Sequence, residues 1–151
     1  MQIHLDGTNV MNAPRERVFS LLTDPNFLAK TLPDAEDVRV LDSASLEAKL
    51  KLRIAVVSSS LKVKMTVAEK TPTTGATLLA EGSGSGSTMK IKSTFLLSGE
   101  KPTTMNWTAD AEIGGVMAGL GSSLLKGFAT KKVAEIFAGI TRSIEESTKA
   151  S

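Results

Sequence analysis

The chain has 151 residues, of which 41% are hydrophobic and 23% are charged. This balance is typical of one globular domain with a sizeable hydrophobic core, and it argues against intrinsic disorder. The net charge of +2 disfavours a nucleic-acid-binding protein, and the absence of cysteine excludes disulfides and thiolate metal sites. We therefore expect a single domain over residues 1–151, with no nucleic acid among its partners.

The first part of the chain predicts one strand and two short helices. Residues 2–11 alternate weakly between polar and apolar side chains, as a strand does. A helix is expected within residues 12–25, where the apolar side chains share one face. Asp24 followed by Pro25 is a typical helix start, in which Asp24 caps a second short helix over residues 26–32.

Strict alternation then predicts an antiparallel sheet in the middle of the chain. Apolar side chains alternate with charged ones along residues 45–56 and again along residues 60–70. The serines at 58–60 predict the hairpin between these two strands. Further strands are expected over residues 76–86, 87–99 and 104–113.

The same alternation predicts which side chains face the core. A slip of one residue would send every side chain of a strand to the opposite face, so exposure tests the register. We expect Leu52, Val63 and Ile91 to be buried, and their neighbours Lys51, Lys62 and Lys90 to be exposed.

The last part of the chain predicts one long helix, from Val116 to about Ser147. Its apolar stripe changes phase along the way, which predicts either a bend near Gly127 or burial of the helix on two sides. Glycine inside a helix is unfavourable, so Gly119 and Gly121 are expected either to allow close approach to the sheet or to leave room for a ligand. Grouped strands with segregated helices indicate the α+β class.

Residues 113–125 form an uncharged run that is too short to span a membrane, since a spanning helix needs roughly 20 apolar residues. The N-terminal residues show no basic segment followed by an apolar run, so no signal peptide is expected. The sequence therefore predicts a cytoplasmic location.

The residues that usually carry catalysis are scarce. His4 is the only histidine, so it cannot form a metal site with a second histidine or a cysteine, and it is expected to be an exposed or edge residue. The glycine-rich residues 81–87 lack the Lys-Ser/Thr pair of a phosphate loop and are expected to connect strands. No catalytic residue, metal site or cofactor is predicted.

Basic side chains gather on the polar side of neighbouring predicted strands. One interpretation is a solvated outer face whose charges discourage edge pairing. The other is a surface that contacts an anionic partner or membrane. These residues are Lys49, Lys51, Arg53, Lys62, Lys64, Lys90 and Lys92.

Two segments, APRERVFSLLTDPNFLAKTLPDAE and ADAEIGGVMAGLGSSLLKGFATKKVAEIFAGI, resemble the CoxG family of carbon monoxide dehydrogenase subunits, which belongs to the START-like, or SRPBCC, superfamily. The most specific parts are the D-P…L-P element of Asp24, Pro25, Leu32 and Pro33, and the G-G-x-x-A-G-x-G start of the long helix at 114–121. The family commonly has Pro-Gly-Cys where this chain has Pro33-Asp34-Ala35.

The resemblance implies a helix-grip fold, in which a curved seven-stranded antiparallel sheet surrounds a long C-terminal helix and two short helices follow the first strand. A hydrophobic cavity is expected between sheet and helix. The implied function is a non-enzymatic accessory protein that binds a lipid or quinone, serves a molybdenum hydroxylase and contacts the inner membrane face peripherally. The alternatives are a cyclase or dehydratase using the same cavity, and an interaction module whose cavity is filled by its own side chains.

The cavity is predicted to lie between the first half of the long helix and the inner face of the sheet. Methionine suits adaptable apolar pockets because its side chain is flexible and polarizable, and several methionines fall on these faces. The alternative is an ordinary packed core. The predicted lining is Met65, Met89, Phe95, Met105, Trp107, Met117, Leu120, Leu124 and Phe128, with Phe27 near the mouth.

Overall fold

The computed structural model describes residues 1–32 and 34–149, which form one seven-stranded antiparallel sheet and a small set of helices. The strand order is β1-β7-β6-β5-β4-β3-β2, so consecutive strands are neighbours except that β1 pairs with β7. The elements are β1 (Gln2–Met11), α1 (Arg15–Leu22), α2 (Pro25–Ala29), β2 (Ala35–Asp42), β3 (Ser45–Ile54), β4 (Val57–Thr71), β5 (Gly75–Gly84), β6 (Ser87–Ser98), β7 (Thr103–Gly115), the 3₁₀ helix η1 (Val116–Leu120) and α3 (Ser122–Lys149).

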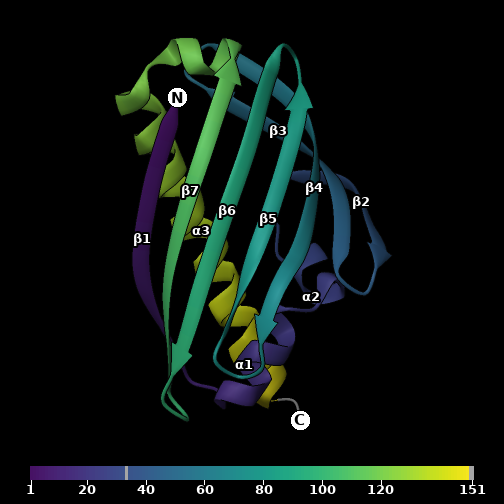
Figure 1. Cartoon of the computed structure of the whole chain (residues 1–151), viewed down its shortest axis with the longest axis vertical. Coiled ribbons are helices and arrows are strands. Elements are labelled where there is room, and N and C mark those ends of the chain that lie inside the picture. The colour runs from purple at the N-terminus through teal and green to yellow at the C-terminus, as the bar shows by residue number, and fades with distance from the viewer. Residues whose placement is uncertain (33, 150–151) are drawn as a thin grey trace.

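The sheet curves around one face of α3, and the two layers enclose the core (Figure 1). The short helices α1 and α2 close one end of this arrangement, beside the last part of α3. η1 and the first turns of α3 lie at the opposite end, near the N-terminus. The predicted α+β helix-grip fold, with seven strands and two short helices after the first strand, is confirmed.

The predicted register is confirmed by the pairing of the strands and by exposure. Ile91 stands between Ala80 and Ala111 on the neighbouring strands, all facing inward. Val63 is buried, whereas Leu52 and Ile91 face inward but are only half-buried, which bears on the site below. The three lysines expected on the outer face, Lys51, Lys62 and Lys90, are exposed.

The predicted start of the second short helix is confirmed. The carboxylate of Asp24 accepts a hydrogen bond from the backbone N–H of Asn26 at 2.9 Å, and Pro25 occupies the first helical position. This cap satisfies one of the backbone N–H groups that a helix start leaves without a partner. Pro33, the last residue of the D-P…L-P element, lies outside the described residues.

The hairpin expected at Ser58–Ser60 is wrong. The turn between β3 and β4 consists of Ala55 and Val56, and Ile54 pairs with Val57 directly before and after it. The three serines belong to β4, where Ser59 is buried on the inner face. Serine is common in turns, but here the pairing register demands a two-residue connection, and the serines fit the strand.

The long C-terminal helix is confirmed, but its expected start at Val116 is wrong. The chain forms η1 first and then breaks at Gly121, whose backbone has φ +91° and ψ +154°, a conformation essentially restricted to glycine. α3 begins anew at Ser122 and continues without interruption through Gly127 to Lys149. A Cβ at Gly119 or Gly121 would meet nothing within 4 Å, so these glycines do not serve close approach to the sheet.

We expect Gly121→Ala to destabilise the fold by about 1–3 kcal/mol, because alanine is strained in this backbone conformation. Gly127→Ala is the matched control, since Gly127 lies inside α3 and a Cβ there would also meet nothing within 4 Å. Alanine at 127 should stabilise the helix by up to about 1 kcal/mol. Urea unfolding of both variants measures the difference, and equal stability of the two would contradict the structural role of Gly121.

Candidate functional site

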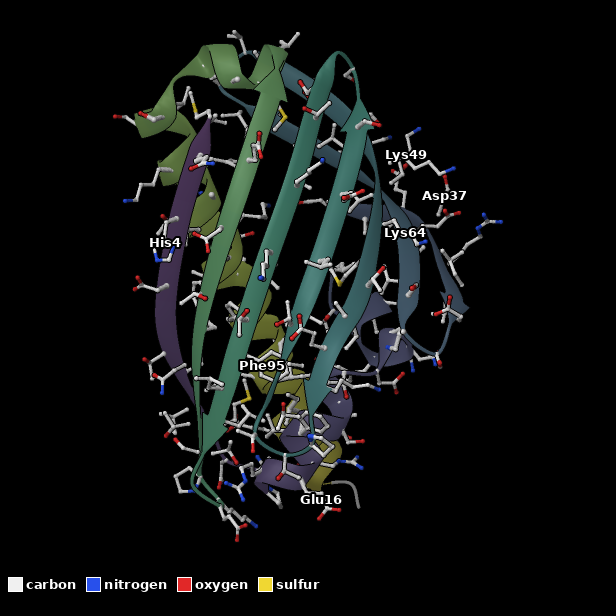
Figure 2. The ribbon with its side chains drawn as sticks, in the orientation of Figure 1. His4, Glu16, Asp37, Lys49, Lys64 and Phe95 are labelled. Atoms are coloured by element: carbon white, nitrogen blue, oxygen red, sulfur yellow. The ribbon has the colours of Figure 1, made fainter. Side chains whose placement is uncertain are left out.

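Most of the buried apolar residues form two clusters at opposite ends of the interior. The α1 cluster joins α1 and the last part of α3 to the sheet, and Figure 2 shows Phe95 in this region. The η1 cluster joins η1 and the first turns of α3 to the other end of the sheet. The α1 cluster consists of Met11, Ala13, Val18, Leu22, Ala76, Phe95, Leu97, Met105, Trp107, Ile140 and Ile144, and the η1 cluster of Ile3, Ile54, Leu61, Val63, Met89, Ile113, Met117 and Leu125.

Between the two clusters, two cross-strand rows of the inner face remain half-buried. One row runs from Met65 through Ala80 and Ile91 to Ala111, and the other runs from Leu78 through Ser93 and Ala109 to Leu5. All eight side chains have intermediate exposure. We call these eight residues the central floor.

Several floor residues contact the end clusters: Leu5 and Ala109 pack against the α1 cluster, and Leu5, Ala80, Ile91 and Ala111 pack against the η1 cluster. Small side chains help to explain why the floor is nevertheless only half-buried. Ala80, Ser93, Ala109 and Ala111 contribute little volume, whereas the rows on either side carry larger residues that are buried. Across from the floor, α3 presents half-buried apolar side chains at Phe128, Val133 and Ile136. Apolar side chains that face a covering helix and still keep exposed surface are typical of an open apolar space rather than a close-packed core.

The polar groups of the inner face are mostly occupied by the protein itself. Ser93 Oγ donates to the carbonyl of Thr108 at 3.1 Å, and Trp107 Nε1 donates to Asn9 Oδ1 at 3.0 Å. Ser59 differs, because its hydroxyl is buried and has no hydrogen-bond partner. The central floor contains no ionisable side chain, so it offers neither an acid nor a base.

A groove of about 280 Å³ lies between the edge strand β1 and α3. The rings of Trp107 and Phe137 meet in it, with their centroids 4.7 Å apart. Gly7 allows the Trp107 ring to lie directly against β1, because a Cβ at Gly7 would stand 2.7 Å from it. Trp107 therefore sits beside the interior and next to solvent, where a bound molecule would change its fluorescence.

Most residues of the predicted cavity lining lie in the end clusters or pack against them, and Met65 alone of them belongs to the central floor. The predicted lining contains none of the small residues of the floor, because large and flexible side chains such as methionine are typical of adaptable apolar pockets. The repeated occurrence of the small residues at inward positions of β5–β7 is the pattern that marks them. Phe95, Met105 and Trp107 lie in the α1 cluster with Phe27 packed against it, and Met89 and Met117 lie in the η1 cluster with Leu120 and Phe128 packed against it.

Leu124 departs from the predicted lining, because its side chain is 43% exposed. Leu125 takes the buried position instead and belongs to the η1 cluster. The break at Gly121 explains the difference, since α3 restarts at Ser122 with its own rotation and the stripe predicted for a continuous helix from Val116 no longer applies.

An ion pair joins α3 to the loop between α2 and β2. Lys132 Nζ lies 2.7 Å from Asp34 Oδ2 and 3.2 Å from Glu135 Oε2, and it stands 5.7 Å from the centroid of the Phe128 ring. The Asp34 carboxylate, followed by that of Glu135, raises the pKa of Lys132. Asp34 has φ +61°, a backbone conformation that favours glycine. This pair links the two sides of the interior next to Phe128.

The outer face of the sheet carries a row of alternating charges. Cross-strand neighbours from β2 to β7 alternate in sign along the row, which favours this register over a slipped one. Arg39 binds the carboxylate of Glu47 and lowers its pKa. The row consists of Arg39, Glu47, Lys64, Glu81, Lys90 and Glu112.

The basic residues predicted for an anionic contact are all exposed, but most of them have acidic neighbours. Lys64 and Lys90 belong to the alternating row, Lys92 stands opposite Asp110, and Lys51 Nζ lies 3.2 Å from Glu36 Oε1. Lys49 stands between Glu36 on β2 and Lys62 on β4, and Figure 2 shows Lys49 and Lys64 extending from this side of the sheet. Arg53 lies close to the β3–β4 turn.

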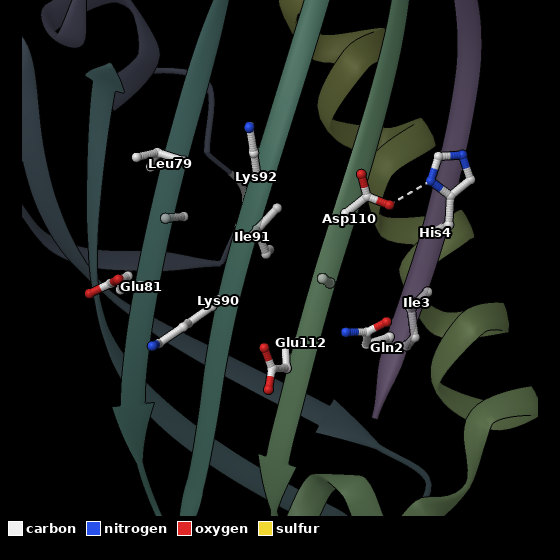
Figure 3. Close-up of a pocket in the computed structure, with 12 residues that line it drawn as sticks. Gln2, Ile3, His4, Leu79, Glu81, Lys90, Ile91, Lys92, Asp110 and Glu112 are labelled. Atoms are coloured by element: carbon white, nitrogen blue, oxygen red, sulfur yellow. Dashed lines mark hydrogen bonds and ion pairs between the residues drawn. The ribbon is translucent and has the colours of Figure 1, made fainter. Parts of the chain in front are cut away.

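A shallow hollow of about 480 Å³ lies on the outer face over β1, β7, β6 and β5 (Figure 3). Lys90 and Lys92 line it together with Glu81, Asp110 and Glu112. Its charges are mixed, so it does not favour an anion. His4 lies at its edge on β1, as expected for an exposed edge residue.

Among residues 1–32 and 34–149, no group of three or more His, Cys, Asp or Glu residues is arranged to hold a metal ion. Within the same residues, no helix combines the length and the apolar character that crossing a bilayer requires.

Comparison with known proteins identifies one family model, that of the carbon monoxide dehydrogenase subunit called CoxG, which matches residues 7–145. A search of curated proteins found no significant match.

Several solved structures share the fold. A conserved protein from Geobacillus kaustophilus is 24% identical, with a TM-score of 0.86 over 96% of this chain and 97% of that one. A START superfamily protein from Mycobacterium smegmatis is 15% identical, with a TM-score of 0.72 over 96% and 99% of the two chains. The Zhui aromatase/cyclase from Streptomyces sp. R1128 is 13% identical, with a TM-score of 0.67 over 96% and 94%. At these identities the likeness establishes the fold.

We expect Ala109→Leu to leave the free energy of unfolding nearly unchanged, because the added carbons enter the open space over the central floor. Ala76→Leu is the matched control, since Ala76 is 6% exposed within the α1 cluster. Overpacking there should cost about 1–3 kcal/mol. Equal losses in chemical denaturation of the two variants would show that the central floor is packed like the clusters.

We expect the pKa of His4 to lie above 6.5, because Asp110 and then Asp6 accept hydrogen bonds from its ring. A raised pKa means that this contact stabilises the fold fully below pH 6.5 and is lost as the pH rises through the folded-state value. An NMR titration of the imidazole should give a lower pKa in Asp110→Asn than in the unchanged protein. An identical titration curve in that variant would show that the contact does not form in solution.

Proposed function

The chain belongs to the CoxG family of carbon monoxide dehydrogenase subunits, and we propose on this basis that it is a non-enzymatic accessory protein that binds a hydrophobic small molecule. The family match and the START-like fold support a ligand-binding accessory role. The observation that carries the proposal is the half-buried central floor beneath α3, which lies between two packed clusters.

The ligand class that fits this space is a lipid or a quinone. The eight floor residues are apolar except Ser93, whose hydroxyl already donates to the protein backbone. Binding there would gain free energy chiefly by removing apolar surface from water, at about 25 cal/mol per Å². The unpartnered hydroxyl of Ser59 is available to donate a hydrogen bond to a carbonyl or ester oxygen at the polar end of such a molecule.

The family membership leads us to propose a molybdenum hydroxylase of the carbon monoxide dehydrogenase type as the partner enzyme. The protein would carry the lipophilic molecule between that enzyme and the inner face of the cytoplasmic membrane, which it would contact peripherally. Exposed basic residues of the sheet, among them Arg53, Lys49 and Lys62, would favour the anionic side of such a contact.

The alternative is a cyclase or dehydratase acting in the same space. It is considered because the Zhui aromatase/cyclase has a similar fold. Such an enzyme needs a positioned acid or base. pKa shifts occur at His4, Arg39 and Glu47 on the outer face and at Lys132 at the edge of the interior. Lys132 is the one of these next to the interior, and it is already paired with Asp34. The accessory role therefore has the stronger support.

Addition of a soluble short-chain quinone should quench the fluorescence of Trp107, the only tryptophan of the chain, in a saturable way. The same titration with Ala109→Leu should show at least tenfold weaker binding, because leucine fills the space over the central floor. Native mass spectrometry of gently purified protein should show a retained hydrophobic molecule in the unchanged chain and less of it in the variant. Unsaturable quenching that is identical in both proteins would refute a ligand site on the floor.

A further inference from the structure

Three segments of the chain meet at the end of the molecule opposite α1. They are the β3–β4 hairpin (residues 51–60), the β5–β6 hairpin (residues 82–89), and the end of β7 with η1 and the start of α3 (residues 113–126). In Figure 1 the β5–β6 connection, η1 and the start of α3 lie at this end. We call this surface the η1 pole.

Specific contacts hold the three segments together. The backbone N–H of Val116 donates to the carbonyl of Gly86 at 3.0 Å, and that of Ser60 donates to Ser85 Oγ at 3.0 Å. Ile54 of the β3–β4 hairpin and Leu125 of α3 both belong to the η1 cluster. The pole is therefore one continuous surface over this cluster.

Apolar side chains project from the η1 pole into solvent. Val56, in the β3–β4 turn, is 91% exposed, Val116 is 54% exposed and Leu124 is 43% exposed. Single exposed apolar residues need no explanation, but three on neighbouring segments do. The turn itself does not explain the valine at position 56, because two-residue hairpin turns favour glycine, asparagine and aspartate.

The charge of the η1 pole has one sign. The three segments contain Lys51, Arg53 and Lys126 but no aspartate or glutamate, although the whole chain has 16 acidic residues against 18 basic ones. Lys51 pairs with Glu36 of β2, while Arg53 and Lys126 are exposed. α3 begins at this pole, so the positive end of its dipole adds to the same sign.

We propose that the η1 pole docks on an anionic lipid bilayer, with Val56, Val116 and Leu124 in the interfacial layer. Protruding apolar side chains among basic residues suit binding to an anionic bilayer. Burial of the apolar side chains and attraction of the basic ones to anionic headgroups both contribute to the binding free energy. A stable protein interface needs roughly 20–30 residues on each side, whereas the pole offers three apolar side chains on small projections. This docking extends the proposed function, because it brings the η1 end of the interior to the membrane from which a lipophilic ligand would come.

Vesicle flotation tests the proposal, with phosphatidylcholine vesicles that contain or lack phosphatidylglycerol. We expect binding only to the anionic vesicles, with Val56→Asp and Val116→Asp each weakening it at least about tenfold. Val10→Asp is the matched control, because Val10 is 57% exposed on β1 at the opposite end of the sheet, and it should leave binding unchanged. Arg53→Gln should weaken binding most at low salt, where screening is least.

Circular dichroism identifies any variant that fails to fold, and Val56→Ser replaces Val56→Asp if needed. Full binding by both pole variants, or an equal loss in Val10→Asp, would overturn the proposal. Dimerisation of the unchanged protein that the pole variants abolish would overturn it too, since the pole would then contact a second copy. Quinone quenching of Trp107 is measured without vesicles, so a failure of docking is distinguishable from a failure of ligand binding.

Discussion

The structure depends on an incomplete contact between a wide curved sheet and a single helix. α3 has to cover the inner face of seven strands, and it does so by packing firmly at both ends, where the α1 and η1 clusters bury large side chains. Between the ends, the eight residues of the central floor stay half-buried. Close packing is the rule inside proteins, so in the function that we propose the packed clusters on either side would hold this stretch open for a ligand.

The charged side chains on the outer face of the sheet help to specify the register of the strands. A sheet with one apolar face would lose its arrangement if a strand slipped by one residue, because every side chain would change sides. In the observed register, the charges from Arg39 to Glu112 pair with the opposite sign on every neighbouring strand, whereas a slip by one residue would separate them. Exposed pairs of this kind contribute little to stability individually, so their effect is on specificity of pairing rather than on free energy of unfolding.

The extent to which the sequence predicts the structure follows from how local each determinant is. The register of β3, β4 and β6 and the Asp24 cap were predictable, because alternation and capping involve neighbouring residues. β2 was not singled out as a strand, since it is an edge strand with most of its side chains exposed and so carries no clear alternation. The break at Gly121 was not predicted, because the sequence alone does not distinguish a glycine that adopts a positive φ from a glycine that is tolerated inside a helix. The central floor was not predictable, because a short side chain such as alanine is common everywhere in a sheet. Its size alone does not show which alanines lie opposite a helix.

The ion pair between Asp34 and Lys132 has a consequence for exchange of a bound molecule. Aspartate tolerates a φ of +61° better than most residues, but less well than glycine would at this position. Both partners keep solvent exposure, so their attraction is partly screened and adds little net stability. The pair nevertheless connects two elements that a molecule passing between α3 and the α2–β2 loop would have to separate. For the lipid or quinone that we propose as the ligand, opening this pair would set how quickly the interior is entered and left, and the rate of that exchange would then depend on ionic strength even though the ligand itself carries no charge.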